Sequence, residues 1–424
     1  MKFYIETFGC TANQGYSQDL ARALQETGHT ETTLDEADAV IVNTCAVTEK
    51  TERKVLRRLS QLQGDRLIVA GCLSVAVPES LNGIRCRARY GLLNQSSASG
   101  ISALFGVTQN GSPARLPEGI GSRTMPSGLG QSDSLCAVVN VSEGCNGSCS
   151  YCIVSIARGR LKSRSVEDVA AEVAGLAAMG AAEVQISAQD TASYGSDIGT
   201  DLGRLLDRMA VIPGDFRLRV GMMNPNNVLL IKDRLLRAYQ SPRIYRFLHI
   251  PVQSGSDEIL RSMGRRYSAE DFLNIAGAFR SSFPKITIIT DVIVGFPGET
   301  EEDFLETLQL IERLDPDKVN ITRFSARPGT AAASKYDMPD RIKKDRSREL
   351  TRLWLDIAAR RNMQYKGQIL EARITERGRD GTMKARAENY LGIVIKCQLR
   401  LGSLIRVLVE ESNAFYVSGR IVED

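Results

Sequence analysis

Three cysteines in one short segment are spaced to hold an iron–sulfur cluster. Cys145, Cys149 and Cys152 stand at C-x3-C-x2-C spacing within VNVSEGCNGSCSYCIVSIARGR, with Tyr151 just before the last of them. A [4Fe–4S] cluster normally takes four cysteine thiolates. Three thiolates hold the cluster but leave one of its irons open to a further ligand.

An open iron is the site at which radical S-adenosylmethionine enzymes bind the methionine end of their cofactor. The sequence therefore predicts that S-adenosylmethionine binds beside Cys145, Cys149 and Cys152. The alternatives are three buried cysteines or a zinc knuckle. A structural zinc site needs four ligands, and no fourth Cys or His lies nearby.

Three more cysteines each follow an expected strand, at Cys10 in FGC, Cys45 in NTC and Cys72 in AGC. In an open parallel sheet the carboxyl ends of the strands share one edge, where ligands bind. These cysteines therefore predict a second cluster with an open iron, beside which Gly9 and Gly71 would allow tight backbone turns. The alternative is that all three are ordinary buried cysteines.

The N-terminal elements must carry this second set. Residues 1–108 alternate expected strands with expected helices; the strands are 2–8, 38–43 and 66–70, and the helices are 15–28 and 50–64. Such alternation predicts an open parallel sheet with helices on its faces. Residues 109–134 are rich in Gly, Ser and Pro, which predicts a linker.

The central part, residues 135–362, repeats a strand–helix unit six times. The expected strands are 135–141, 183–188, 216–222, 246–252, 286–295 and 318–325. Six units predict a partial (β/α)6 barrel whose site lies at the C-terminal mouth of the strands. Asp190 and Asp291 are expected at strand ends there. They would either form hydrogen bonds with a ligand or cap the ends of their strands.

The end of the chain changes pattern after an expected helix at 340–366, in which Trp354 is expected to be a core residue. Residues 363–424 form short strands and turns, which predict a small antiparallel β-barrel. Five basic residues are expected on one face of it, namely Arg373, Arg377, Arg379, Lys384 and Arg386. Such a face favours contact with an RNA backbone, although a charge run can also be plain solvated surface.

The composition excludes several classes of protein. The chain has 424 residues, 43% of them hydrophobic, yet no apolar run of about 18 that would span a membrane. Nine cysteines without a secretory signal favour a reducing compartment, here the cytoplasm, and metal ligation over disulfides. The chain has only two histidines, His29 and His249, which argues against a histidine-based metal site and against a catalytic triad. His249 is expected to be a hydrogen-bonding residue. Three cysteines fit neither set and are expected in the core: Cys86, Cys136 and Cys397.

From end to end, the chain resembles the radical S-adenosylmethionine methylthiotransferases. The resemblance rests on FGCTAN, NTC and AGC, on the C-x3-C-x2-C loop followed by ARGR-x2-SR, and on a terminal module similar to a TRAM domain. The strings SAQDTASYGSDIGTDL, LRVGMMNPNN, FLHIPVQSGSD, TDVIVGFPGET and RPGTAAA resemble the branch that acts on N6-threonylcarbamoyladenosine in tRNA. The chain departs from the family at Tyr16, where many relatives are acidic, and at Ser155, where other branches have proline.

The resemblance implies roles for particular residues. One [4Fe–4S] cluster would be held by Cys145, Cys149 and Cys152, and an auxiliary one by Cys10, Cys45 and Cys72. Contact with S-adenosylmethionine would come from the strand-end motifs, through Tyr151, Gln189, Asn224, Gln253, Ser254 and Gly295.

The implied reaction uses two molecules of S-adenosylmethionine per turnover. One methylates sulfur at the auxiliary cluster, and the other gives a 5′-deoxyadenosyl radical that takes hydrogen from C2 of the modified adenine, next to the anticodon at position 37. The implied partners are the anticodon stem-loop of tRNA and a reductant such as ferredoxin or flavodoxin, with the enzyme a monomer and no membrane involved. Two alternatives within the family are the isopentenyladenosine branch and the branch that modifies a ribosomal protein aspartate. The alternative outside the family is an RNA-binding sulfur carrier without catalytic activity.

Overall fold

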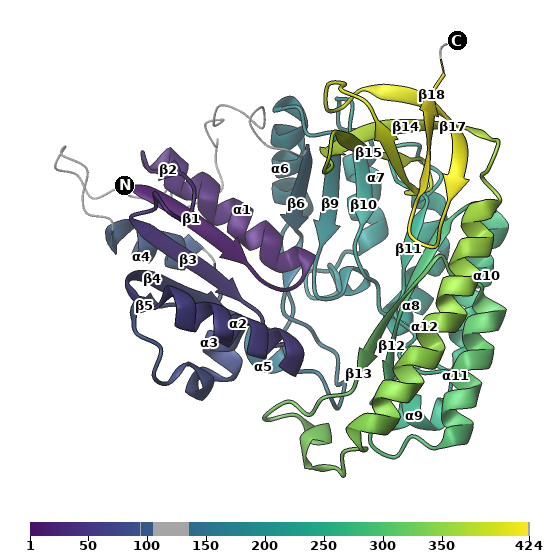
Figure 1. Ribbon diagram of the computed structural model, residues 1–424, viewed down its shortest axis with the longest axis horizontal. Helices are drawn as coiled ribbons and strands as arrows, with labels where there is room; N and C mark the ends of the chain where they lie inside the picture. The colour runs from purple at the N-terminus through teal and green to yellow at the C-terminus, as the bar shows by residue number, and fades with distance from the viewer. Residues whose placement is uncertain (94, 105–134, 423–424) are drawn as a thin grey trace.

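The N-terminal sheet is parallel throughout and open at both edges. The computed structural model describes residues 1–93, 95–104 and 135–422 (Figure 1), so the expected linker over 109–134 lies outside the described residues. The strand order is β2-β1-β3-β4-β5. The strands are β1 (Lys2–Thr7), β2 (Thr30–Glu31), β3 (Ala39–Thr44), β4 (Gly64–Gly71) and β5 (Cys86–Arg89). Every residue of the central strand β3 is buried, as expected for a strand covered on both faces.

Helices cover both faces of this sheet. They are α1 (Thr11–Glu26), α2 (Glu49–Leu62), α3 (Cys72–Ala76), the 3-10 turn η1 (Pro78–Leu81) and α4 (Gln95–Leu104). Helix α1 starts four residues before the expected position at 15. The side chain of Asn13 explains the early start, because it donates hydrogen bonds to the carbonyls of Phe8 (2.7 Å) and Thr44 (3.0 Å) and so ties the first turn to the strand ends.

The six expected central strands are all present and form a partial barrel. They are β6 (Cys136–Asn140), β9 (Glu183–Ser187), β10 (Arg217–Val220), β11 (Phe247–His249), β12 (Thr287–Val294) and β13 (Lys318–Arg323). Two parallel sheets, β10-β9-β6 and β11-β12-β13, are joined by a bridge between Leu218 and Ile244. Outward-facing residues such as Val184 and Leu248 pack into the main core beneath the helices.

The covering helices follow the strands, as expected for β/α units. They are α6 (Val166–Ala178), α7 (Leu202–Ala210), α8 (Pro225–Ala238), α10 (Ala269–Ser282), α11 (Glu301–Leu314) and α12 (Asp340–Met363). Shorter elements shape the mouth: β7 (Ser142–Glu143), α5 (Val154–Arg158), β8 (Lys162–Ser163), η3 (Thr191–Ser193), α9 (Asp257–Ser262) and η4 (Ala331–Ser334). Among the described residues no helix is long and apolar enough to cross a membrane.

The C-terminal residues close into a five-stranded barrel, drawn in yellow in Figure 1. Its strands are β14 (Ile369–Arg377), β15 (Thr382–Ala387), β16 (Gly392–Lys396), β17 (Leu404–Ser412) and β18 (Val417–Ile421). The pairing is antiparallel except between β16 and β18, which run parallel. The half-buried Trp354 of α12 helps to dock this barrel, because its ring meets Phe415 edge to face.

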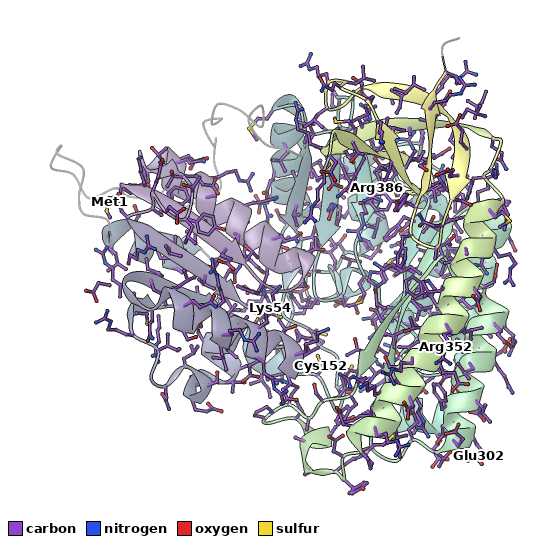
Figure 2. The ribbon with its side chains drawn as sticks, viewed as in Figure 1. Met1, Lys54, Cys152, Glu302, Arg352 and Arg386 are labelled. Carbon is purple, nitrogen blue, oxygen red and sulfur yellow. The ribbon has the colours of Figure 1, made fainter. Side chains whose placement is uncertain are left out.

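The expected basic face of this barrel is wrong for two of its members. Arg373 is buried and forms a two-pronged ion pair with Asp215, just before β10. Arg386 stacks on Tyr390 at 4.7 Å, at the junction with the central strands, where Figure 2 labels it. The local pattern showed a charged strand face, but the neighbouring domain covers part of it.

The three remaining cysteines are less buried than expected. Cys86, Cys136 and Cys397 are all only partly buried, and Cys86 accepts a hydrogen bond from the Nε of Arg89 at 3.4 Å. Cys86 and Cys397 pack at the margins of hydrophobic clusters rather than inside them. The expectation that all three lie in the core was therefore too strong.

Candidate functional site

Three adjacent strands bring the N-terminal cysteines to one edge of the sheet. Cys10 follows β1, Cys45 follows β3 and Cys72 follows β4, and these strands are neighbours. Glycine is required beside them. Gly9 and Gly71 have φ of +107° and +102°, and a Cβ on Gly9 would lie 2.9 Å from the Cys45 Sγ.

The thiols of this set influence one another. Burial, together with the neighbouring Cys72 and Cys10, raises the pKa of Cys45 to about 11. Burial also raises the pKa of Cys72. The thiols of Cys45 and Cys72 are therefore protonated near neutral pH, and binding a metal group at this edge would release their protons.

The second set lies in the loop between β7 and α5. The amide of Gly147 donates to the Cys145 Sγ at 3.2 Å, and a Cβ on Gly147 would lie 3.7 Å from the Cys149 Sγ. The amide of Cys152 donates to the carbonyl of Cys149 at 3.2 Å, which closes the turn. Burial, together with the neighbouring Cys149 and Cys145, raises the pKa of Cys152 to about 11.

Both sets suit an iron–sulfur cluster better than a single metal ion. Across the residues that the structure describes, no three His, Cys, Asp or Glu side chains are placed to hold one ion. In a cluster each thiolate binds its own iron, so the sulfurs need not converge on a point. A cavity of about 450 Å³ opens beside the second loop, lined by Cys145, Asn146, Gly147 and Arg160, and offers room there.

Tyr151 is fixed by an arginine that the sequence analysis missed. Arg265 donates a hydrogen bond to the Tyr151 hydroxyl and stacks on its ring at 5.6 Å. The charge of Arg265 acts on both Cys149 and Cys152, and its own Nε is buried with no hydrogen-bond partner among the described residues. Burial lowers the pKa of Arg265, but Tyr151, Tyr267 and Cys149 raise it well above the ordinary value. No spacing motif marks this residue, because its role depends on distant parts of the chain.

A second buried arginine lies beside the N-terminal cysteine set, on the short helix that follows the second set. Arg158, from α5, donates to the Asn13 Oδ1 at 2.5 Å and stacks on Tyr16 at 4.9 Å. Its NH1 lies 3.5 Å from Glu143, and its charge acts on both Cys72 and Cys10. The side chain is only 3% exposed. The ARGR string contains this residue, although nothing local in the string shows which groups it contacts.

Helix α1 brings the N-terminal sheet against the first strand of the partial barrel. The Val138 amide donates to the Gln18 Oε1 at 3.0 Å, and the Asn140 Nδ2 donates to the Ala12 carbonyl at 3.1 Å. Figure 2 shows Cys152 between the N-terminal domain and β13, at the mouth of the barrel. The two cysteine sets, far apart in sequence, thus belong to one site region.

Two of the residues expected to contact the cofactor lie in loops at this mouth. Both side-chain amide atoms of Gln189 are buried without a partner, so this group is suited to a ligand that the described residues do not supply. The Asn224 amide donates to the Asp190 Oδ1 at 2.9 Å. Asp190 also accepts from Asn227 and from Ala192, so it braces these loops, and burial raises its pKa.

The other three expected residues have evident packing roles. Gln253 has a φ of +75° and its amide donates to the Asp291 carbonyl at 2.8 Å. Ser254 is completely buried beside Thr307. Gly295 packs against the aliphatic part of Lys343, where any Cβ would collide, and its amide donates to Glu299.

His249 has the hydrogen-bonding role expected for it. Its Nε2 lies 3.0 Å from the Asp291 Oδ1, which also accepts from the Asn320 Nδ2 at 2.6 Å. Burial alone would raise the pKa of Asp291, but the bonds to His249 and Asn320 lower it below the ordinary value. Asp291 is thus engaged inside the barrel rather than in capping a strand.

Comparison with known families covers each part of the chain. Residues 2–88 match the Uncharacterized protein family UPF0004, residues 139–311 match the Radical SAM superfamily, and residues 363–422 match the TRAM domain. A probable threonylcarbamoyladenosine tRNA methylthiotransferase of Pyrococcus horikoshii is 38% identical over 100% of both chains. The chain belongs to the radical S-adenosylmethionine methylthiotransferases, in their threonylcarbamoyladenosine tRNA branch. Membership in the Radical SAM superfamily implies a [4Fe–4S] cluster and S-adenosylmethionine.

Further relatives include both tRNA branches. A probable threonylcarbamoyladenosine tRNA methylthiotransferase of Pyrococcus abyssi is 41% identical and covers 93% of each chain. A tRNA-2-methylthio-N(6)-dimethylallyladenosine synthase of Thermoanaerobacter sp. is 35% identical over 99% of this chain and 93% of its own. The two Pyrococcus relatives are thus more similar to this chain than this synthase is.

Solved structures share the fold at low identity. A radical S-adenosylmethionine methyltransferase from Kitasatospora setae, with cobalamin and a [4Fe–4S] cluster bound, superposes with a TM-score of 0.55 at 15% identity, covering 78% of this chain and 77% of that one. This likeness confirms the predicted α/β architecture with its central radical S-adenosylmethionine barrel.

Proposed function

We propose that this enzyme inserts a methylthio group at C2 of N6-threonylcarbamoyladenosine, next to the anticodon of tRNA at position 37. The observation that carries the proposal is the pair of three-cysteine sets at one site, with Arg158 beside the N-terminal set on the short helix that follows the second. One set alone would serve a simple radical enzyme. Two sets match a reaction that needs both a radical and a sulfur source.

The two sets would hold two [4Fe–4S] clusters, with Cys145, Cys149 and Cys152 on one and the N-terminal cysteines on the other. Bound there, the clusters would supply the electron that splits S-adenosylmethionine and the sulfur that is transferred, with two S-adenosylmethionine molecules used per turnover. The protein keeps both sites shielded, since five of its six cysteines are at least partly buried.

The mouth of the barrel would position S-adenosylmethionine through its own polar groups. Gln189 would use its unpaired amide on the cofactor, and Asn224 would present its side chain from the start of α8. Tyr151, held by Arg265, would orient the loop that carries Cys149 and Cys152. Gln253, Ser254 and Gly295 would shape the neighbouring walls.

The substrate would be the anticodon stem-loop, whose target base must leave its stack to reach the mouth. The TRAM domain would hold the phosphate backbone through residues such as the exposed Arg379. The enzyme would work as a monomer in the cytoplasm, where tRNA is found, with a ferredoxin or flavodoxin as reductant.

Mass spectrometry of tRNA nucleosides from cells with and without this gene tests the proposal. We expect 2-methylthio-N6-threonylcarbamoyladenosine to disappear on deletion while its unthiolated precursor accumulates. Loss of a methylthiolated dimethylallyladenosine instead would reassign the substrate to the other branch. If no tRNA nucleoside changes, the proposal is wrong.

A further inference from the structure

Polar side chains line the inside of the partial barrel. Five successive strands place partly exposed polar residues on the inner face, namely Gln185, Arg219, His249, Asp291 and Asn320, and β10 adds Arg217 two residues below Arg219. Their neighbours along the strands, such as Val184, Leu218 and Leu248, point outward into the main core. The inner face therefore forms a polar lumen below the mouth.

The acidic member of this lumen already has its partners. Asp291 is bonded to His249 at 3.0 Å and to Asn320 at 2.6 Å. Its charge is therefore directed toward these two groups. Of the two arginines on this face, Arg219 is the one nearer the mouth.

Arg219 is held in place by neutral groups alone. Its guanidinium lies 4.7 Å from the Phe247 ring and 5.2 Å from the Tyr390 ring, and its NH1 donates to the Gln185 Oε1 at 3.0 Å. The Nε is buried, and no residue that the structure describes forms a hydrogen bond with it. Within the described part of the chain no carboxylate forms an ion pair with it. A planar guanidinium fixed in this way keeps both charge and hydrogen-bonding capacity for an anion.

The position of Arg219 suits one end of the proposed substrate. It stands one residue before the end of β10, two residues and about 7 Å along the strand below Gly221, where the mouth begins. Threonine joined to adenine N6 through a carbamoyl group keeps a free carboxylate. Because C6 and C2 of adenine both adjoin N1, this arm starts close to the reacting carbon.

We propose that Arg219, steadied by Gln185, binds the carboxylate of the threonylcarbamoyl arm and thereby selects this substrate. The inference rests on the proposed function and adds a residue that determines specificity. A dimethylallyl arm has no carboxylate and would leave the arginine unpaired in the lumen. The site thus accepts the acidic arm and disfavours the apolar one.

Binding of three anticodon stem-loops tests the inference. They carry N6-threonylcarbamoyladenosine, its methyl ester, or N6-dimethylallyladenosine, and their dissociation constants are measured at one salt concentration with the full-length, cluster-reconstituted enzyme. We expect the unaltered enzyme to bind the acid roughly 10- to 100-fold more tightly than the ester. Arg219→Gln should bring this ratio close to one, and Arg219→Lys should keep part of it.

Arg217→Gln is the matched control, because Arg217 lies two residues lower on the same face and stacks on Tyr245. This variant should keep the full preference for acid over ester. A preference that survives in Arg219→Gln overturns the inference. Equal binding of acid and ester by the unaltered enzyme also overturns it, even if no Arg219 variant folds.

The proposed function has its own readout in the same series. If the unaltered enzyme converts the acid stem-loop to the methylthio product, that function stands whatever the binding ratios are. If it converts only the dimethylallyl stem-loop, the proposed function fails, and with it the basis for a carboxylate in the lumen.

Discussion

Cys45 and Cys152 each belong to one of the two sets of three cysteines, and they lie in different parts of the fold. Cys45 lies at the end of β3 in the N-terminal set, whereas Cys152 lies in the loop before α5. Cys45 is buried and Cys152 is partly buried, and burial raises each thiol pKa to about 11. Their different positions allow the two halves of the reaction to be separated by substitution.

Cys45→Ala should abolish methylthiolation while leaving the cleavage of S-adenosylmethionine intact. Removing one of three thiolates disables the N-terminal set alone, so iron should fall from about eight to about four per chain. Product is measured by nucleoside mass spectrometry, cleavage by release of 5′-deoxyadenosine, and iron by colorimetric assay. Cys152→Ala is the matched variant and should lose both activities. Normal product from Cys45→Ala would mean that the N-terminal cysteines are inert.

Arg158→Met should lower the free energy of unfolding by about 1–3 kcal/mol, because it leaves buried polar groups without their partner. The Asn13 Oδ1 loses its hydrogen bond and Glu143 loses its nearest cation. Urea denaturation measures the change. Arg53→Met is the control, since its ion pair with Glu49 is largely exposed and contributes little. An equal effect at both positions would show that the buried contacts of Arg158 stabilise the protein no more than an exposed ion pair does.

At the scale of elements, helix α1 determines how the N-terminal domain meets the barrel. Gly15 lies on the face of α1 that packs on β6, and a Cβ there would stand 2.6 Å from the Asn140 Nδ2 and 2.9 Å from the Val138 Cγ1. Local helix propensity would favour alanine at this position. The packed strand requires glycine, because Val138 lies on a rigid backbone.

Gly15→Ala should therefore destabilise the protein by about 1–3 kcal/mol, the usual cost of overpacking. Gly277→Ala in α10 is the opposite case, because a Cβ there meets nothing within 4 Å. It should stabilise the protein by about 0.5–1 kcal/mol through helix propensity alone. Thermal and urea unfolding measure whether each variant is destabilised or stabilised relative to the unaltered protein. Stabilisation at Gly15 would show that α1 and β6 are not tightly packed.

At the scale of the whole molecule, the C-terminal barrel closes the N-terminal end of the central barrel, opposite the mouth. Tyr390 reaches across the junction and donates to the Glu183 Oε1 at 2.7 Å. Glu183 is completely buried at the start of β9. Burial and the nearby Glu183 raise the pKa of Tyr390 well above its ordinary value, so the hydroxyl stays a donor.

Tyr390→Phe should lower the free energy of unfolding by about 1–3 kcal/mol, because a buried carboxylate loses a donor. Tyr336→Phe serves as the control, since Tyr336 is 80% exposed and its hydroxyl is solvated. That change should stay within about 0.5 kcal/mol. Urea denaturation compares the two variants, and a neutral effect at Tyr390 would mean that the docked junction adds no stability.

The sequence by itself determined the main strands and the spacing of the candidate cysteine ligands. All six central strands, the small C-terminal barrel and the three strand-end cysteines follow from local periodicity and spacing. The C-x3-C-x2-C loop needs no tertiary information either, because its three thiols are neighbours along the chain. Short-range patterns of this kind encode strand ends and loop ligands directly.

Only the tertiary structure decided which charged residues meet. The buried site of Arg158, the support of Tyr151 by Arg265 and the inward position of Arg219 each depend on elements distant in sequence. The basic face expected on the C-terminal barrel was wrong at Arg373 and Arg386, because the central domain covers them. The partner of a charge is set by the domain that packs against it, and a local sequence pattern does not contain that information.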